Sequence, residues 1–282
     1  MTHNPDPRSS RRTAPWPELP QQSGSPVTAR YQPRPSGESK KAPKDDKATM
    51  PWYVEIPMVV VLTLGLIFLL QTFVGRVYLI PSASMEPTLH GCEGCNGDRI
   101  FVEKVSYYFS DPEPGDIVVF EGTDSWNTNY VSNRSDNPIV AGLQQLGSYV
   151  GLVAPDENDL VKRIVATGGQ TVSCQAGDPA VMVDDEPIDQ SYILQPHANP
   201  IIGDEASEAC GGSFFGPLTV PDDHVFVMGD NRTNSLDSRA HMGDQFQGTI
   251  PEENIRGKVS FIILPLTRIG SVNNQDIQPQ QQ

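Results

Sequence analysis

The longest apolar stretch of the chain covers Ile56–Gly75. These 20 residues carry no charge and are bounded by Glu55 and Arg76. A helix of about 20 apolar residues can cross the hydrocarbon core of a bilayer, and Pro57 suits the first turn of such a helix. We therefore predict a transmembrane anchor over residues 56–75.

Two other structures share this hydropathy pattern, a buried helix of a globular domain and a cleaved signal peptide. The apolar region of a signal peptide is normally about 7–15 residues long, and its charged leader is short. Here the apolar run is longer and follows about 50 polar residues. The pattern favours an anchor that stays on the protein.

From residue 99 onward the pattern changes to short runs rich in β-branched residues, separated by Gly, Pro and Asp. Many short strands with turns between them predict a mainly antiparallel β domain. Residues 121–158 and 195–220 are polar and are predicted to be loops or insertions. The predicted strands are Arg99–Lys104, Asp116–Phe120, Leu160–Thr167, Thr171–Cys174, Val181–Val183, Ser191–Leu194, Val225–Met228 and Arg256–Leu264.

The first 50 residues differ from the rest in composition and charge. They are rich in Pro, Ser, Lys and Arg and contain almost no aliphatic residues, so we expect a disordered tail. The tail has nine Lys/Arg against five Asp/Glu, and basic flanks favour the cytoplasmic side of a membrane. Residues 76–282 are then extracytoplasmic. Because the whole chain has a net charge of −15, this part is strongly acidic, which argues against a nucleic-acid partner.

All four cysteines follow the apolar run. On an oxidising side of the membrane they can form disulfides, whereas a single Cys-x-x-Cys without a second pair is a weak zinc signal. Four cysteines allow three pairings. We favour Cys92 with Cys95 and Cys174 with Cys210, and we expect no metal site.

The segment Ile80–Leu89 contains two serines, Ser82 and Ser84, between Pro81 and Pro87. The prolines fix φ and stiffen the backbone that carries the hydroxyls. Ser84 lies nine residues after the apolar run, and nine extended residues reach at most about 30 Å. Serines between prolines are also common in ordinary surface turns. A nucleophilic role for Ser84 requires a nearby base.

The histidines offer no recognisable catalytic setting for that base, and a lysine can replace histidine if it is neutral. Its pKa must then fall from about 10.4 to about 8, which burial can achieve. Past the anchor the lysines are Lys104, Lys162 and Lys258. Strand alternation places Lys162 on one face with Leu160 and Ile164, so Lys162 is the candidate base. The alternative is an edge-strand lysine whose amine stays in water.

A third candidate segment is the polar loop Gly229–Arg239, which follows a predicted apolar strand. This loop could be an ordinary solvated turn. In a functional interpretation its hydroxyls position the lysine amine, and its Asp and Arg residues form ion pairs that fix the loop. Arg163, on the strand face opposite Lys162, is a natural partner for those acids.

These segments resemble bacterial type I signal peptidases, the membrane-bound leader peptidases, and are most similar to the actinobacterial members. The resemblance covers residues from about 55 to 265, and all four motifs occur in family order after a single anchor. The matching segments are Pro81–Leu89, Gly115–Phe120, Lys162–Arg163 and Gly229–Arg239.

The resemblance implies Ser84 as nucleophile and Lys162 as general base, with the Ser82 hydroxyl and the Ser84 N–H as the oxyanion hole. It implies that Ser235 hydrogen-bonds the Lys162 amine. A supporting ion-pair shell and a substrate cleft are also implied. The shell would contain Asp237, Arg239, Arg163 and Asp230, and the cleft would be lined by Ile80, Pro81 and Met85.

The family fold is two antiparallel β-sheet regions, and the less constant insertion is expected at about 173–220. The sequence departs from the family at Thr233, which replaces a common acid, and at Ala166–Gln170, which differs from the usual turn. The implied enzyme is a monomer without cofactor that acts on preproteins bearing signal peptides at the membrane. Two alternatives are a Ser-Lys peptidase for a narrower set of envelope proteins and a non-catalytic, membrane-anchored β binding domain.

Overall fold

The structure is a computed structural model that describes residues 51–92, 97–127, 134–149 and 159–278. The predicted disordered tail, residues 1–50, and Cys95 lie outside these ranges. The predicted fold class is confirmed, because the described part is mainly antiparallel β-sheet behind one long apolar helix. The boundaries predicted for the tail, the anchor and the insertion stay predictions.

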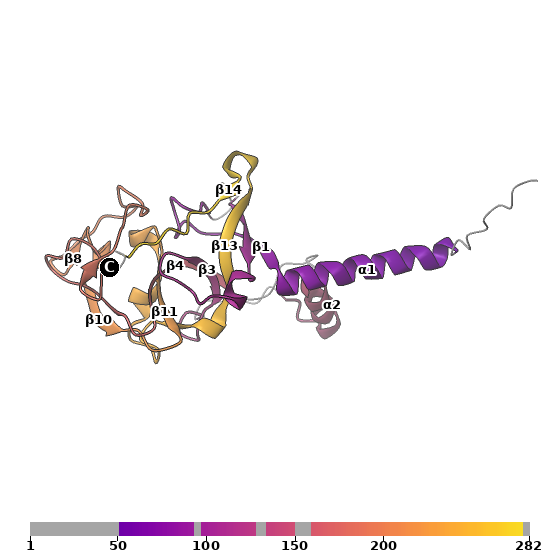
Figure 1. Cartoon of the computed structure of the whole chain (residues 1–282), viewed down its shortest axis with the longest axis horizontal. Helices are drawn as coiled ribbons and strands as arrows, with labels where there is room; N and C mark the ends of the chain where they lie inside the picture. Colours follow the sequence, from indigo (N-terminus) through magenta and orange to yellow (C-terminus); the bar gives the residue numbers. More distant parts are fainter. Residues whose placement is uncertain (1–50, 93–96, 128–133, 150–158, 279–282) are drawn as a thin grey trace, which may run out of the picture. The chain divides into compact units, whose positions relative to one another are not determined.

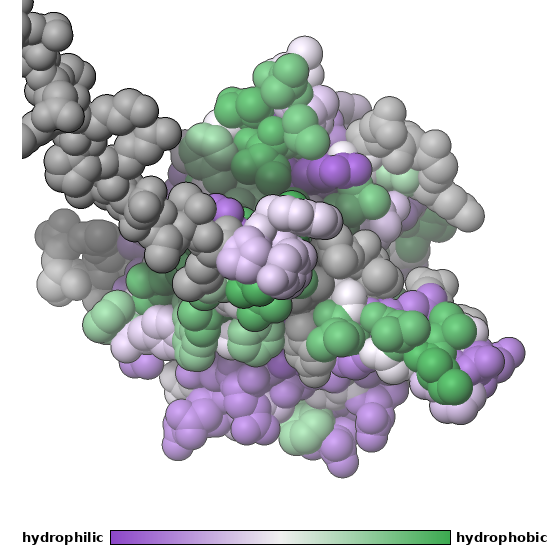
Figure 2. Space-filling model, turned by 90° about the vertical axis from the view of Figure 1, so that its right-hand side faces the viewer, coloured by the Kyte–Doolittle hydropathy of each residue, from purple (hydrophilic) through white to green (hydrophobic). Residues whose placement is uncertain are grey.

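Helix α1 spans Trp52–Phe73, and none of its residues is buried. Within the described ranges it is the one helix that is long and apolar enough to cross a membrane. It begins before the predicted start, because Trp52 and Tyr53 extend the run past Glu55, which fits into the first helical turn. Pro57 therefore lies inside the helix and not in its first turn. Figure 2 shows apolar residues, in green, exposed in separate groups on the face it views.

The main sheet contains eight strands in the order β1-β2-β13-β3-β4-β11-β12, with β14 paired to β13. Every pairing is antiparallel. Figure 1 shows the long strand β13 between β1 and β3, with β4 and β11 beyond. The strands are β1 (Gly75–Leu79), β2 (Arg99–Glu103), β3 (Ile117–Glu121), β4 (Asp159–Thr167), β11 (His224–Met228), β12 (Ile250–Pro251), β13 (Ile255–Leu264) and β14 (Gly270–Ser271).

Two smaller sheets occupy the region between β4 and β11. One has the order β10-β5-β6-β7 and the other is the pair β8-β9. Cys174, at the end of β5, forms a disulfide with Cys210, which is the pairing favoured from the sequence. Cys92 is also disulfide-bonded. The strands are β5 (Thr171–Cys174), β6 (Met182–Val183), β7 (Glu186–Pro187), β8 (Ala206–Ser207), β9 (Gly212–Ser213) and β10 (Phe215–Thr219).

Three local features differ from what the sequence suggested. Strand β1 was missed because its residues adjoin the apolar run. Helix α2 (Pro138–Tyr149) lies in a predicted loop, where Asn137 Oδ1 accepts a hydrogen bond from Ile139 N and stabilises the first turn. The predicted strand Ser191–Leu194 is instead a turn, because Asp189 accepts from the backbone N–H of Ser191 and Ile193 N bonds back to Gln190 O.

Short 3-10 helices connect several strands. Two of them, η2 and η3, follow β11 and lie inside the polar loop predicted to support the site. The five segments are η1 (Ser106–Tyr108), η2 (Arg232–Asn234), η3 (Ser238–His241), η4 (Glu252–Asn254) and η5 (Leu266–Arg268).

The main sheet buries apolar residues on both faces around β3 and β4. One cluster packs Met85, Leu89 and Val161 with side chains of β2, β3 and β13. A second packs Phe120, Trp126 and Ile164 with side chains of β11. Strand β4, which carries Lys162, is therefore enclosed by core on both sides, as its alternating sequence predicts.

The last described segment, residues 272–278, is here called the C-terminal strap. After β14 it returns across the domain and lies beside β3, where the Asn274 side chain accepts from Ile117 N at 2.8 Å and donates to Val259 O at 2.8 Å. Ile277 is 1% exposed. Gly115 must be glycine at this crossing, because its φ is +97° and a Cβ would lie 1.9 Å from Gln275 O.

Candidate active site

The structure brings Ser84 and Lys162 together although 78 residues separate them. Nζ of Lys162 lies 2.8 Å from Oγ of Ser84, which is hydrogen-bonding distance. Lys162 lies in the middle of β4, opposite Val118 of β3, and is only 4% exposed. A neutral amine at this place can accept the hydroxyl proton of the serine.

Burial is the largest influence on Lys162 and lowers its pKa from 10.5 to about 8. The carboxylates of Asp237 and Asp230 act in the opposite direction, and Arg239 lowers the pKa further. Burial disfavours the charged ammonium because it removes water that would solvate it. With this pKa about a tenth of the amine is neutral at pH 7 and about half at pH 8.

The nucleophile segment is fixed by the loop that follows β11. Asn231 N donates to Ser84 O at 3.1 Å, and Asn231 Nδ2 donates to Ala83 O at 3.0 Å. Gly229 approaches so closely that a Cβ would lie 2.5 Å from Ser84 O. These contacts position the backbone of Ser84 against the loop that follows β11.

Ser82 Oγ lies 3.3 Å from Ser84 Oγ, and its role in an oxyanion hole stays a prediction. Ser235 also lies at the site and lines the same cavity as Lys162. Its Oγ is buried and is not hydrogen-bonded to Lys162, whereas its side chain helps to lower the pKa of the neighbouring Asp237. The hydrogen bond to Lys162 that the family resemblance implied is therefore not formed in this structure.

The Asp and Arg residues around the site form two separate ion pairs, whereas the family resemblance implied a single group of four. Asp237 binds Arg239, with 2.8 Å between Oδ1 and Nε, and also accepts from Gly229 N at 3.0 Å. Burial alone would raise the pKa of Asp237, but Arg239 and this N–H outweigh it and the pKa is lowered. Arg239 also donates to Arg232 O at 2.7 Å. This hydrogen bond joins two positions of the loop that follows β11.

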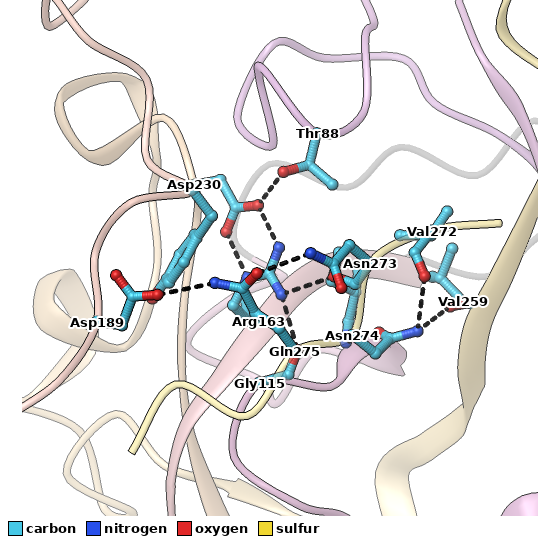
Figure 3. Close-up of polar contacts among 12 residues, drawn as sticks. Thr88, Gly115, Arg163, Asp189, Asp230, Val259, Val272, Asn273, Asn274 and Gln275 are labelled. Carbon is cyan, nitrogen blue, oxygen red and sulfur yellow. Dashed lines mark hydrogen bonds and ion pairs between the residues drawn. The ribbon is translucent and has the colours of Figure 1, made fainter. Parts of the chain in front are cut away.

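The second pair joins Arg163 to Asp230 in a bidentate arrangement, with distances of 2.9 and 2.8 Å. Their side chains are 1% and 0% exposed. Figure 3 shows Arg163 between Asp230 and the C-terminal strap, where it donates to Asn273 O at 3.3 Å. Asp230 also accepts from Thr88 Oγ1 at 2.5 Å. The pair thus connects the strand of Lys162, the loop after β11 and the segment of Ser84.

A cavity of about 510 Å³ contains the reacting groups. It is lined by Ser82, Ser84, Lys162 and Ser235, which the sequence singled out. Six further lining residues were not predicted as site residues: Trp126, Leu160, Thr233, Asn234, Leu236 and His241. Trp126 and His241 lie in segments without a motif, so only the three-dimensional structure identifies them.

The residues predicted for the substrate cleft lie beside the nucleophile but do not line this cavity. Ile80 and Met85 are 3% and 1% exposed and pack in the core below Ser84, whereas Pro81 is exposed. Their role in a substrate cleft stays a prediction. Thr233, the departure from the family pattern, binds Asn199 through its hydroxyl and carbonyl oxygens. Within the described ranges no group of three or more metal-ligating residues occurs.

Comparisons with known proteins give matches over most of the chain. A family model described as signal peptidase, peptidase S26, matches residues 53–264. Signal peptidase I of Mycobacterium tuberculosis (strain ATCC 25618 / H37Rv) is 47% identical over 252 residues, covering 87% of this chain and 84% of that protein. Signal peptidase I of Leptolyngbya laminosa is 31% identical over 238 residues, covering 84% and 91%.

A solved signal peptidase I from Enterococcus faecalis V583 aligns with a TM-score of 0.30 and 18% identity, covering 54% of this chain and 98% of that one. This likeness is too low to support conclusions about the fold, which rests on the strand pairings described above.

Proposed function

The chain belongs to the signal peptidase family, peptidase S26, a family of serine proteases, and from this premise we propose that it removes signal peptides from exported proteins with a Ser84–Lys162 dyad. The observation that supports the dyad is the 2.8 Å contact between Nζ and Oγ at a lysine that is 4% exposed. No other lysine in the described ranges lines the cavity of Ser84.

Catalysis begins when neutral Lys162 takes the proton of Ser84 Oγ, which attacks the scissile carbonyl carbon. The resulting oxyanion accepts hydrogen bonds from the Ser82 hydroxyl and the Ser84 N–H. Protonated Lys162 then gives its proton to the leaving amine as the C–N bond breaks, leaving an ester on Ser84. The neutral lysine next removes a proton from water, which hydrolyses the ester and regenerates the enzyme.

The anchor places this chemistry at the membrane. Helix α1 is long enough to span a bilayer, and β1 begins two residues after it ends. The basic tail keeps the N-terminus in the cytoplasm, so residues 76–282 face outward, where the cleavage site of a translocated signal peptide emerges. Exposed Val77 and Leu79 of β1 suit a position at the membrane surface. The substrates are preproteins whose cleavage sites end in small residues.

The pH dependence of cleavage tests the dyad. We expect kcat/KM for a peptide with an Ala-x-Ala site to rise about tenfold per pH unit below 8 and to level off above it, because only neutral Lys162 can accept the serine proton and its pKa is about 8. The measurement is cleavage by the purified full chain in detergent between pH 5 and 10. A flat profile contradicts a lysine base.

Replacing Ser82 tests the oxyanion hole. Ser82→Ala is expected to lower kcat by about 10²–10³ with little change in KM, because the lost donor acts on charge that develops in the transition state. Ser82→Thr keeps a hydroxyl and serves as the matched control. An equal rise in KM with unchanged kcat would assign Ser82 to ground-state binding.

A further inference from the structure

One wall of the cavity that contains Ser84 and Lys162 is not used by the dyad. Trp126 and His241 form it, with ring centroids 4.3 Å apart and planes inclined by 18°. Trp126 is 7% exposed and packs edge-on against Phe120, at 5.5 Å between centroids. Leu160 and Leu236 line the same cavity. The wall is therefore mainly aromatic and aliphatic.

This wall is built from two segments that are distant in the chain and joined to one another. Ser125, next to Trp126, donates to Asp244 Oδ2 at 2.5 Å. Asp244 Oδ1 in turn accepts from the backbone N–H groups of Phe246 and Gly248, both at 2.9 Å. The stacked pair is thus held in place by its neighbours and is available as a preformed surface.

Leu236 is the least expected member of the wall. It lies between Ser235 and Asp237 in a polar loop, yet its own side chain is 63% exposed. Exposing a leucine to water gains nothing for folding, because apolar surface is stabilising only when buried. A substrate side chain that covers Leu236 would remove this surface from water.

The direction of proton transfer decides which part of a substrate reaches this wall. In the proposed mechanism Lys162 protonates the leaving amine, so the amine must come within hydrogen-bonding distance of Nζ. The residues that follow the amine then start on the Lys162 side of Ser84. Leu160, Leu236, Trp126 and His241 line the same cavity as Lys162.

We propose that Trp126, His241 and Leu236 form a subsite for an apolar or aromatic side chain in the first two residues after the scissile bond, at the new N-terminus of the mature protein. This inference rests on the proposed function. A cavity of about 510 Å³ has room for such side chains. Burial lowers the pKa of His241, against the opposing effect of Asp244 and Asp237, so its ring is neutral near neutral pH and suits an apolar neighbour.

The test compares two peptides with the same signal-peptide half ending in Ala-x-Ala. One continues with Leu-Phe and the other with Gly-Gly. Hydrophobic pockets discriminate by about 10–200-fold, so we expect the full-length enzyme in detergent to prefer the Leu-Phe peptide at least tenfold in kcat/KM. Leu236→Ser and His241→Ala, both at accessible positions, should reduce this preference to about twofold. Trp126→Ala is a third variant, used if its thermal unfolding matches the wild type.

Two controls separate the possible causes. Leu266→Ser changes a leucine that is 76% exposed and outside the cavity, and it should keep the preference. A methyl ester of the same acyl half lacks the residues after the bond, so every subsite variant should lose less activity on the ester than on the Leu-Phe peptide. No preference in the wild type, or equal losses on both peptides and the ester, would overturn the subsite. Failure of the wild type on peptides and ester alike would overturn the proposed function itself.

Discussion

Lys162→Met is expected to lower kcat/KM for a signal-peptide substrate by at least about 10⁴, because in the proposed mechanism Lys162 both deprotonates Ser84 and protonates the leaving amine. Methionine keeps the unbranched, apolar part of the side chain. Since Lys162 is 4% exposed and its charged form is disfavoured by burial, the variant should fold with at least the stability of the wild type. Peptide cleavage and thermal unfolding are measured on the same preparations.

A matched control for this change is Lys104→Met. Lys104 donates to Thr72 O at 3.3 Å, beside the end of α1, and does not line the cavity of Ser84. It should retain cleavage within about threefold, since it touches none of the reacting groups. Activity that survives Lys162→Met, or is lost equally in both variants, would remove Lys162 from the mechanism.

Arg163→Met is expected to produce the largest loss of stability. It leaves the carboxylate of Asp230, 0% exposed, without its bidentate partner, and breaking a buried ion pair from one side typically costs roughly 3–5 kcal/mol. For a domain of this size such a loss lowers Tm by about 6–20 °C. The free energy of unfolding is measured by denaturant titration of the full chain in detergent.

Two further variants serve as controls for the loss of stability in Arg163→Met. Adding Asp230→Asn to Arg163→Met removes the unpaired charge and should recover part of the lost free energy. Glu121→Ala breaks the pair of Glu121 with Arg256, whose side chains are 46% and 32% exposed, and should cost at most about 1 kcal/mol. If Arg163→Met lowers the free energy of unfolding no more than Glu121→Ala does, the supporting role of Arg163 is contradicted.

The burial of Lys162 could be predicted from the sequence because its requirements are local. A lysine between Leu160 and Ile164 on one strand face is buried wherever that face packs on a core, and β4 does so. Ser84 was marked by its prolines and by its place after the apolar run. The membrane-length helix follows from composition alone. Its start at Trp52 could not be predicted in this way, because Glu55 interrupts the apolar run but fits into the first helical turn.

The rest of the site depends on contacts between distant segments, for which the chain contains no periodic signal. Trp126 and His241 are 115 positions apart and meet only because β3 and β11 bring their loops to one side of the sheet. Asp230 pairs with Arg163 and Asp237 pairs with Arg239. This choice of partners likewise depends on which face of β4 packs against the loop that follows β11. Ser235 was assigned to the site by family resemblance. The absence of its hydrogen bond to Lys162 depends on side-chain geometry within one loop, which the sequence does not specify.

The C-terminal strap has a consequence for truncated forms of this chain. The Asn273 carbonyl accepts a hydrogen bond from Arg163, and the Asn274 side chain hydrogen-bonds to Ile117 of β3 and Val259 of β13. Arg163 and Asn273 are 110 positions apart. The contacts around β4 are therefore completed only when the strap docks, and a chain cut before residue 272 would leave these groups of Arg163, β3 and β13 without their partners in the strap.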